Sequence, residues 1–247
     1  MKTETTTSLK KTLFNIRFKP YLEFFENKFK IGSNLKEFPH WETNYLYLIF
    51  KDFDNRCSIK LDSQLMVYEQ DKSDLDLENK YIEKLIDIYK KEYNSQASGL
   101  YYTRRYLVEP KIKFQDLVNI LNIKLYSSDE QLKKILPQKT LDLMYRKDFK
   151  LDNEDTLFLT LGATRKNEIP MYILFNSKNH FPPDKMQSEI SKLNESYPDQ
   201  ALFINIDYQR INDQIKKENI DTFYPTAVKF IEDLVMSLKT HLFKTKL

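Results

Sequence analysis

The chain has 247 residues, of which 41% are hydrophobic and 30% are charged, and its formal net charge is +3. This composition excludes a disordered chain, and so small a net charge does not by itself indicate a polyanionic partner. The three glycines, Gly32, Gly99 and Gly162, stand far apart, which excludes the glycine-rich loops that hold dinucleotides or nucleotide phosphates. We expect a globular protein outside several large enzyme classes.

Residues for metal or thiol chemistry are few. Cys57 is alone, which excludes an intrachain disulfide and fits a reducing compartment. His40, His180 and His241 lack metal-ligand spacing; a Ser-His-Asp arrangement is spatial and stays open, but no G-x-S-x-G elbow accompanies it. The chain opens without an apolar leader, and no apolar run approaches a membrane span. We expect a cytoplasmic protein that needs no metal or cofactor and contacts no membrane.

In the first half of the chain, period-2 alternation and helical periodicity predict a strand, a short helix, an antiparallel meander and a long helix. The dipeptides Asp54-Asn55 and Asp62-Ser63 are typical turns between the strands of the meander. The expected strands are 9–18, 45–53, 57–61, 64–69 and 100–108, and the expected helices are 21–30, 74–93 and 114–121.

The second half begins with a helix or linker over 127–137, which we take as the domain boundary. The expected strands are 141–149, 156–163, 171–175 and 200–208, and the expected helices are 183–194, opened by Pro183, and 225–243, opened by Pro225. One apolar stripe runs along the last helix, so we expect Ile231, Val235 and Leu238 to be buried.

The order of these elements lacks the glycine-punctuated rhythm of βαβ units, which favours an α+β protein. We expect mixed, mainly antiparallel sheets and two long amphipathic helices. Each half combines strands with one long helix, so we predict two lobes, 1–126 and 127–247, that share a continuous core.

Several segments resemble a family of uncharacterised bacterial proteins of about 250 residues that is distributed sporadically among genomes. LFNIRF (Leu13–Phe18) is similar to the family's opening strand, although the acidic residue of that motif is absent. GLYYTRRYLVEP (Gly99–Pro110) is similar to its arginine-rich strand through Arg104, Arg105 and Tyr106. Weaker similarities lie at Tyr68 with its acidic successors, at Asn205-Ile206-Asp207, and in the closing helix Ala227–Phe243, where His241 comes later than in the family.

The resemblance covers nearly the whole chain but implies no reaction, cofactor, substrate or site residue. The patchy distribution of the family implies an accessory role, in mobile or anti-phage defence gene cassettes.

The arginine strand is the best local candidate for a site. Tyrosines interleaved with arginines are typical of nucleic-acid surfaces, where rings stack on bases and guanidinium groups hold phosphate. In a strand, however, Arg104 and Arg105 face opposite sides, and the alternative is that one of them is buried and paired with a carboxylate from 69–87. The candidate nucleic-acid-binding residues are Tyr102, Arg104, Arg105, Tyr106, Lys111 and Lys113.

Carboxylates offer a second candidate site. Asp52 and Asp54 point to the same side of a strand and, with Asp62, could hold a hard cation for hydrolysis. The alternative, which we favour, is that these carboxylates cap backbone N–H groups in turns.

Three functions follow from these candidates. The first is a non-enzymatic binding or assembly component with a protein partner or self-association. The second is an RNA- or DNA-binding module centred on Arg104 and Arg105, and the third is a carboxylate-dependent hydrolase. An exposed apolar patch on a helix would favour the first, and an exposed basic and aromatic sheet face would favour the second.

Overall fold

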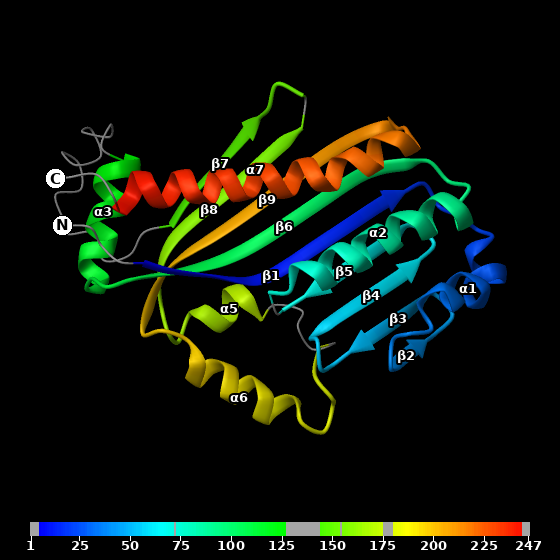
Figure 1. Cartoon of the computed structure of the whole chain (residues 1–247), viewed down its shortest axis with the longest axis horizontal. Helices are drawn as coiled ribbons and strands as arrows, with labels where there is room; N and C mark the ends of the chain where they lie inside the picture. Colours follow the sequence, from blue (N-terminus) through cyan, green and yellow to red (C-terminus); the bar gives the residue numbers. More distant parts are fainter. Residues whose placement is uncertain (1–4, 72, 127–143, 154, 175–179, 244–247) are drawn as a thin grey trace.

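The first strand of the chain lies in the middle of the sheet. The computed structural model describes residues 5–71, 73–126, 144–153, 155–174 and 180–243. In these residues one antiparallel sheet of nine strands has the order β2-β3-β4-β5-β1-β6-β9-β8-β7 (Figure 1). The strands are β1 (Thr5–Phe18), β2 (His40–Thr43), β3 (Tyr47–Asp52), β4 (Cys57–Asp62), β5 (Leu65–Gln70), β6 (Ala97–Pro110), β7 (Met144–Lys150), β8 (Thr156–Arg165) and β9 (Gln200–Ile215).

The helices lie on both faces of this sheet (Figure 1). They are α1 (Phe24–Gly32), α2 (Leu75–Glu92), α3 (Phe114–Tyr126), α5 (Ile169–Ile173), α6 (Met186–Ser196) and α7 (Lys217–Phe243), with a 3₁₀ turn η1 (Ser33–Leu35) after α1. No helix in the described ranges is long and apolar enough to cross a membrane.

The connectivity of the sheet repeats. A long strand, a helix, a meander and a long helix follow one another as β1, α1, β2–β5 and α2, and again as β6, α3, β7–β9 and α7. In each half the long strand pairs with the last strand of its own meander, and β1 and β6 pair antiparallel with Thr12 opposite Arg104. The arrangement therefore approximates two-fold symmetry about the β1–β6 pair, with α5 and α6 added to the second half.

The face under α2 and α7 carries the main core. Alternate residues of the central strands point to this face, so Phe14 of β1 lies opposite Tyr102 of β6, and both are fully buried. Asp74 caps α2 by accepting a hydrogen bond from the backbone N–H of Leu77 at 3.0 Å. From α7, Phe223 and Ile231 complete this core.

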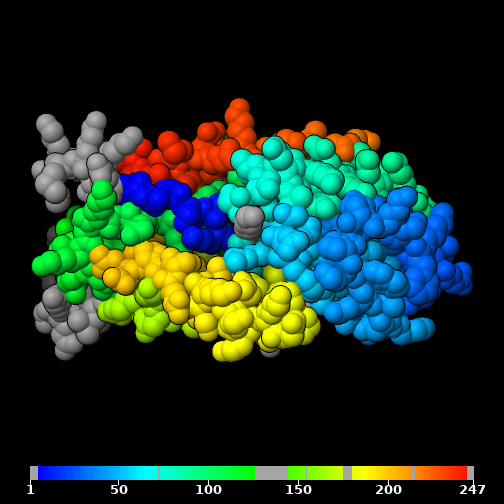
Figure 2. Space-filling view, turned by 60° about the horizontal axis from the view of Figure 1, so that its bottom comes forward, coloured from blue at the N-terminus to red at the C-terminus, as the bar shows by residue number. Residues whose placement is uncertain are grey.

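The opposite face carries a smaller core under α5. Ile169 and Ile173 pack with Leu107 of β6 and Phe203 of β9, the residues that point away from α2 and α7. Figure 2 shows α6, in yellow, along the side of the molecule beside the β3–β4 region. There Nη2 of Arg56 lies 4.0 Å from Oε2 of Glu189.

The α+β prediction is confirmed, and most predicted elements are present with small shifts at their ends. Two lobes are not seen: one sheet and one main core run through both halves. The repeated connectivity divides the chain between α2 and β6. The predicted boundary between 1–126 and 127–247 lies later, at the end of α3, and stays a prediction. The predicted element at 127–137 lies outside the described residues.

Several predicted elements are wrong. Residues 171–175 were expected as a strand, but α5 begins at Ile169 with Pro170 in its first turn, because a short apolar run carries no clear periodicity. Pro183 and Pro225 do not open helices: α6 begins at Met186, and α7 begins at Lys217 because the buried stripe extends back beyond Pro225. β2 was not among the predicted strands. Leu238 is half-buried, whereas Ile231 and Val235 are buried as predicted.

Candidate functional site

The arginine strand forms the centre of the sheet, not its surface. Arg104 lies on the face of α2 and α7 and is 1% exposed. Its Nη2 donates to Oε1 of the fully buried Glu78 at 2.9 Å, and its Nη1 donates to Oε1 of Glu232 at 2.9 Å. The prediction that one arginine is buried and paired with a carboxylate from 69–87 is therefore confirmed.

Glu78 gathers the hydroxyl groups around this ion pair. Its carboxylate accepts hydrogen bonds from Tyr102 at 2.5 Å, Thr12 at 2.9 Å and Tyr224 at 3.0 Å. Burial, together with the negative charge of Glu78, raises the pKa of Tyr102 well above its usual range. We call Thr12, Glu78, Tyr102, Arg104 and Tyr224 the Glu78 cluster. Its hydrogen bonds stabilise the buried ion pair, although Nε of Arg104 has no hydrogen-bond partner among the described residues.

Arg105 faces the other side of the sheet and is half-buried. Its Nε donates to Oδ1 of Asn205 at 3.0 Å, and its Nη1 donates to the carbonyl oxygen of Tyr172 at 2.7 Å. Burial lowers the pKa of its guanidinium group. Arg105 thus fastens α5 to the sheet.

Lys111 and Lys113 lie beyond the end of β6 and are exposed. They line an open hollow together with the carboxylates of Glu109, Asp116 and Asp199. The six candidate residues are therefore not brought together. Tyr102, Arg104 and Tyr106 face the main core, Arg105 faces α5, and the two lysines share a hollow of mixed charge. Nucleic-acid binding by this strand stays a prediction.

A Ser-His-Asp chain is present on the face opposite α2 and α7. An ionised carboxylate only accepts, so Nδ1–H of His180 donates to Oδ2 of Asp71 at 2.6 Å, and Nε2 of a neutral ring accepts from the Ser58 hydroxyl at 3.1 Å. No local motif predicts this arrangement, because the three residues come from β4, the segment after β5 and the segment before α6.

The three hydrogen-bonded residues are closed off from solvent, so a substrate could not reach the Ser58 hydroxyl in this arrangement. His180 is fully buried and Ser58 is 5% exposed, in a strand that pairs on both sides. Nζ of Lys11 lies 3.4 Å from Oδ1 of Asp71 and closer to Oε1 of Glu69, so this buried lysine is shared between two carboxylates. Burial raises the pKa of Cys57 to about 12, so its thiol is protonated at neutral pH. We interpret the chain of hydrogen bonds as a fastening between the sheet and the segment before α6.

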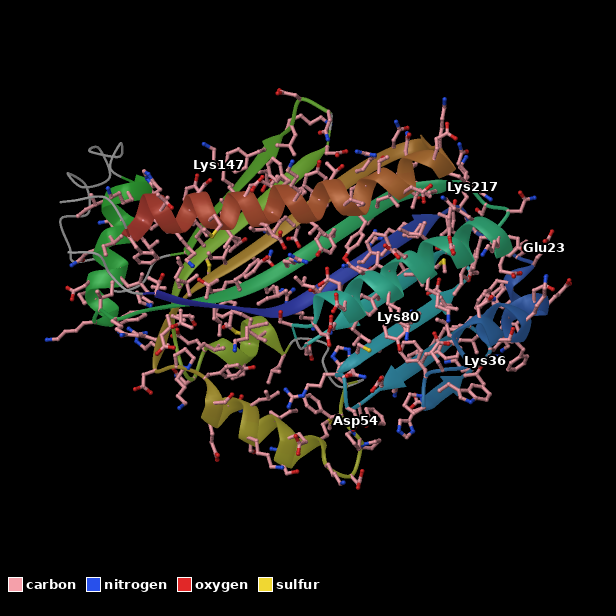
Figure 3. The ribbon with its side chains drawn as sticks, viewed as in Figure 1. Glu23, Lys36, Asp54, Lys80, Lys147 and Lys217 are labelled. Carbon is pink, nitrogen blue, oxygen red and sulfur yellow. The ribbon has the colours of Figure 1, made fainter. Side chains whose placement is uncertain are left out.

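The carboxylates Asp52, Asp54 and Asp62 have structural surroundings. Asp52 accepts from the backbone N–H of Asn55 at 3.0 Å, and Asp62 accepts from that of Gln64 at 2.8 Å, as expected for turn caps. Asp54 is exposed in the turn between β3 and β4 (Figure 3). The described residues contain no group of three or more histidine, cysteine or acidic side chains that could hold a metal ion.

Residues 22–50, which we call the α1–β2 corner, contain an apolar pocket. Its volume is about 320 Å³, and it lies between α1, η1, β2 and β3. Gly32 allows α1 to approach β3 closely, because a Cβ atom there would meet Cδ1 of Leu48 at 2.8 Å. Lys36, labelled beside α1 in Figure 3, is the one charged side chain among its described lining residues. These residues are Phe29, Gly32, Ser33, Leu35, Lys36, Phe38, Pro39, Trp41, Leu48 and Phe50.

Large hydrophobic side chains are exposed in this corner, and two of them, Phe29 and Trp41, line the pocket. Five of the eleven that are exposed in the described residues belong to the corner, so the patch is a local feature. They are Leu22 at 74% exposure, Phe29 at 59%, Trp41 at 56%, Tyr45 at 73% and Leu46 at 59%. The ring of Tyr45 stacks on Phe25 of α1, with centroids 5.1 Å apart. Helical periodicity predicted α1 but not its exposed apolar residues, because an apolar stripe on a helix is typical of a buried face.

No protein-family model and no curated protein matches this chain. The resemblance to the sporadically distributed bacterial family therefore stays a prediction.

Proposed function

We propose that the protein is a non-enzymatic binding or assembly component, and that the α1–β2 corner binds a partner protein. The observation that carries the proposal is the apolar pocket with exposed Trp41 and Phe29 among its lining residues. Isolated exposed hydrophobic residues are ordinary, but several of them within one short segment, two of which line an apolar pocket, are typical of an interaction surface.

The chemistry of the corner supports a protein partner. Aromatic residues, and tryptophan above all, are the side chains that contribute most to protein interfaces. The walls of the pocket are held by buried residues, including Leu35 and Phe38, so a partner side chain would enter a site formed in advance. The polar clusters around Glu78 and His180, in contrast, are occupied with contacts inside the protein.

The cellular context rests on the family resemblance alone. We propose an accessory role, in a mobile or anti-phage defence gene cassette, in which the corner joins this chain to another component.

Display of random peptides tests the docking surface directly. We expect peptides selected on the immobilised protein to lose binding to the double variant Trp41→Ala, Phe29→Ala. They should retain binding to Met236→Ala, which changes an exposed methionine of α7 at 60% exposure. Selected peptides that bind both variants equally, or no specific peptides, would contradict the proposal.

A further inference from the structure

The edge of the sheet next to the pocket is open. β2 is the outermost strand in the described sheet, and each of its four residues is exposed. Natural sheets protect such edges with proline, bulges or covering segments. Here Pro39 precedes the strand, and β2 pairs with β3 in regular register from His40 opposite Lys51 to Thr43 opposite Leu48.

The hydrogen bonds of β2 show which residues face the open edge. The backbone N–H of Asn44 donates to the carbonyl oxygen of Tyr47 at 3.1 Å, in continuation of the β2–β3 register. In an antiparallel pair, hydrogen-bonded and non-hydrogen-bonded positions alternate. His40 and Glu42 therefore bond to β3, and the main-chain groups of Trp41 and Thr43 point outward.

We propose that the partner binds as an extended strand added to β2, an inference that rests on the docking function proposed above. Trp41 and Thr43 would exchange main-chain hydrogen bonds with the new strand, the mode known as β-strand addition. Alternate side chains of that strand would lie beside Trp41 and fill the apolar pocket.

The face of β2 that carries Glu42 determines which side chains fit at the intervening positions of the added strand. Glu42 points away from the pocket and accepts from Nζ of Lys51 at 2.6 Å, while half of its side chain stays exposed. A basic or neutral polar residue opposite Glu42 satisfies this face, whereas an acidic one is repelled. The partner is thus a segment that alternates apolar residues with polar, non-acidic ones.

A second copy of this chain fits the edge less well. Two β2 strands related by a two-fold axis pair antiparallel. When Trp41 of one copy lies opposite Thr43 of the other, Glu42 lies directly opposite Glu42, and like charges there are destabilising. A shift in one direction places Thr43 opposite Pro39, which has no N–H to donate. A shift in the other direction places Thr43 opposite Thr43 of the second copy, and no other residue of β2 then pairs with a residue of β2. These registers favour a different chain.

The peptides selected on the wild-type protein are the probes for this inference. Each is resynthesised with backbone N-methyl groups at single positions. Only alternate N–H groups of an added strand point towards β2 and donate hydrogen bonds to it. We therefore expect methylation at these alternate residues to weaken binding about tenfold each. Methylation at the intervening residues should have little effect.

On the protein, Thr43→Pro removes an outward-facing N–H at a position where an edge strand accepts proline. Its control, Thr43→Val, removes the hydroxyl group and keeps the N–H. We expect Thr43→Pro to weaken binding about tenfold and Thr43→Val to leave it unchanged. If Thr43→Pro unfolds, the methylated peptides decide the question alone.

The outcomes separate the two proposals. Peptides that require Trp41 but tolerate methylation at every position, and that bind a folded Thr43→Pro variant normally, overturn strand addition and leave the docking surface intact. Failure to select any peptide that loses binding to the Trp41→Ala, Phe29→Ala double variant overturns the docking surface and strand addition with it.

Discussion

The Glu78 cluster and the α1–β2 corner reverse the usual placement of polar and apolar groups. In the first, an ion pair lies in the interior, with Arg104 1% exposed and Glu78 fully buried. In the second, aromatic side chains lie at the surface, with Trp41 56% exposed. Contacts within the protein account for the buried charges, because each is hydrogen-bonded. Contacts within the protein leave the rings of Phe29 and Trp41 more than half exposed, and this difference is the reason to place the partner-binding surface at the corner.

Arg104→Ala breaks the buried ion pair of the Glu78 cluster and should have the largest effect on stability. The change leaves the carboxyl group of Glu78 without its cation in the core, so we expect the free energy of unfolding to fall by roughly 3–5 kcal/mol. Urea denaturation measures the effect. Arg146→Ala, which removes a cation of β7 that is 70% exposed, is the control and should change stability by less than about 0.5 kcal/mol. Equal stability of the two variants would show that the ion pair is not desolvated.

Neighbouring residues of α7 sharpen the comparison in the apolar core. Val235→Asp places an unpaired charge at a 5% exposed position, and we expect a loss of about 3 kcal/mol. Met236→Asp introduces the same charge on the same helix at a 60% exposed position and should have little effect. Thermal melting compares the two, and a similar melting temperature would mean that α7 does not pack on the sheet in solution.

Alkaline pH tests the buried tyrosines of both faces. Burial raises the pKa of Tyr89 and of Tyr197 to about 12. In the unfolded chain these tyrosines lose their protons near pH 10, so unfolding above that pH releases protons. The contribution of these two tyrosines to stability should therefore be constant below about pH 10 and fall as the pH rises towards 12. Phenolate absorbance should follow the loss of helical circular dichroism; early ionisation of every tyrosine in the folded state would contradict this expectation.

His180→Ala should have a smaller effect, confined to one region. Ser58 and Asp71 each lose a buried hydrogen-bond partner, so we expect a loss of roughly 2 kcal/mol. Hydrogen exchange should accelerate in α6 and not in α1. Uniform acceleration would show that His180 stabilises the whole fold and does not fasten one segment.

Trp41→Ala should have the smallest effect on stability, within about 0.5 kcal/mol, because most of the indole is already in solvent. Peptide binding should nevertheless be lost. A marked fall in melting temperature would mean that Trp41 is part of the core, and it would return the corner to an ordinary structural role.

Sequence periodicity predicted the fold well where an element has one buried face. The meander and α2 were predicted closely. The pairing of one arginine with a carboxylate from 69–87 followed from strand alternation together with the acidic composition of that segment. The order of the strands did not follow, because pairing of β1 with β6 depends on contacts between distant segments.

The candidate site was mostly beyond the reach of the sequence. Tyr102, Arg104 and Tyr106 have the composition of a nucleic-acid surface, but their burial depends on α2 and α7, which cover them. Phe29 and Trp41 are separated by a helix end and a turn, and only the close approach of α1 to β3 at Gly32 brings them to one pocket. The Ser58–His180 contact likewise joins segments that share no motif.

The central place of β1 affects how the chain folds as it is synthesised. Thr12 pairs with Gln70 on one side and with Arg104 on the other, so during synthesis one edge of β1 stays open until β6 follows. Pairings so distant in sequence form slowly. A nascent chain that has completed α2 but not β6 carries a long, unprotected strand edge, and this stage of synthesis is the one at which aggregation or chaperone binding is expected.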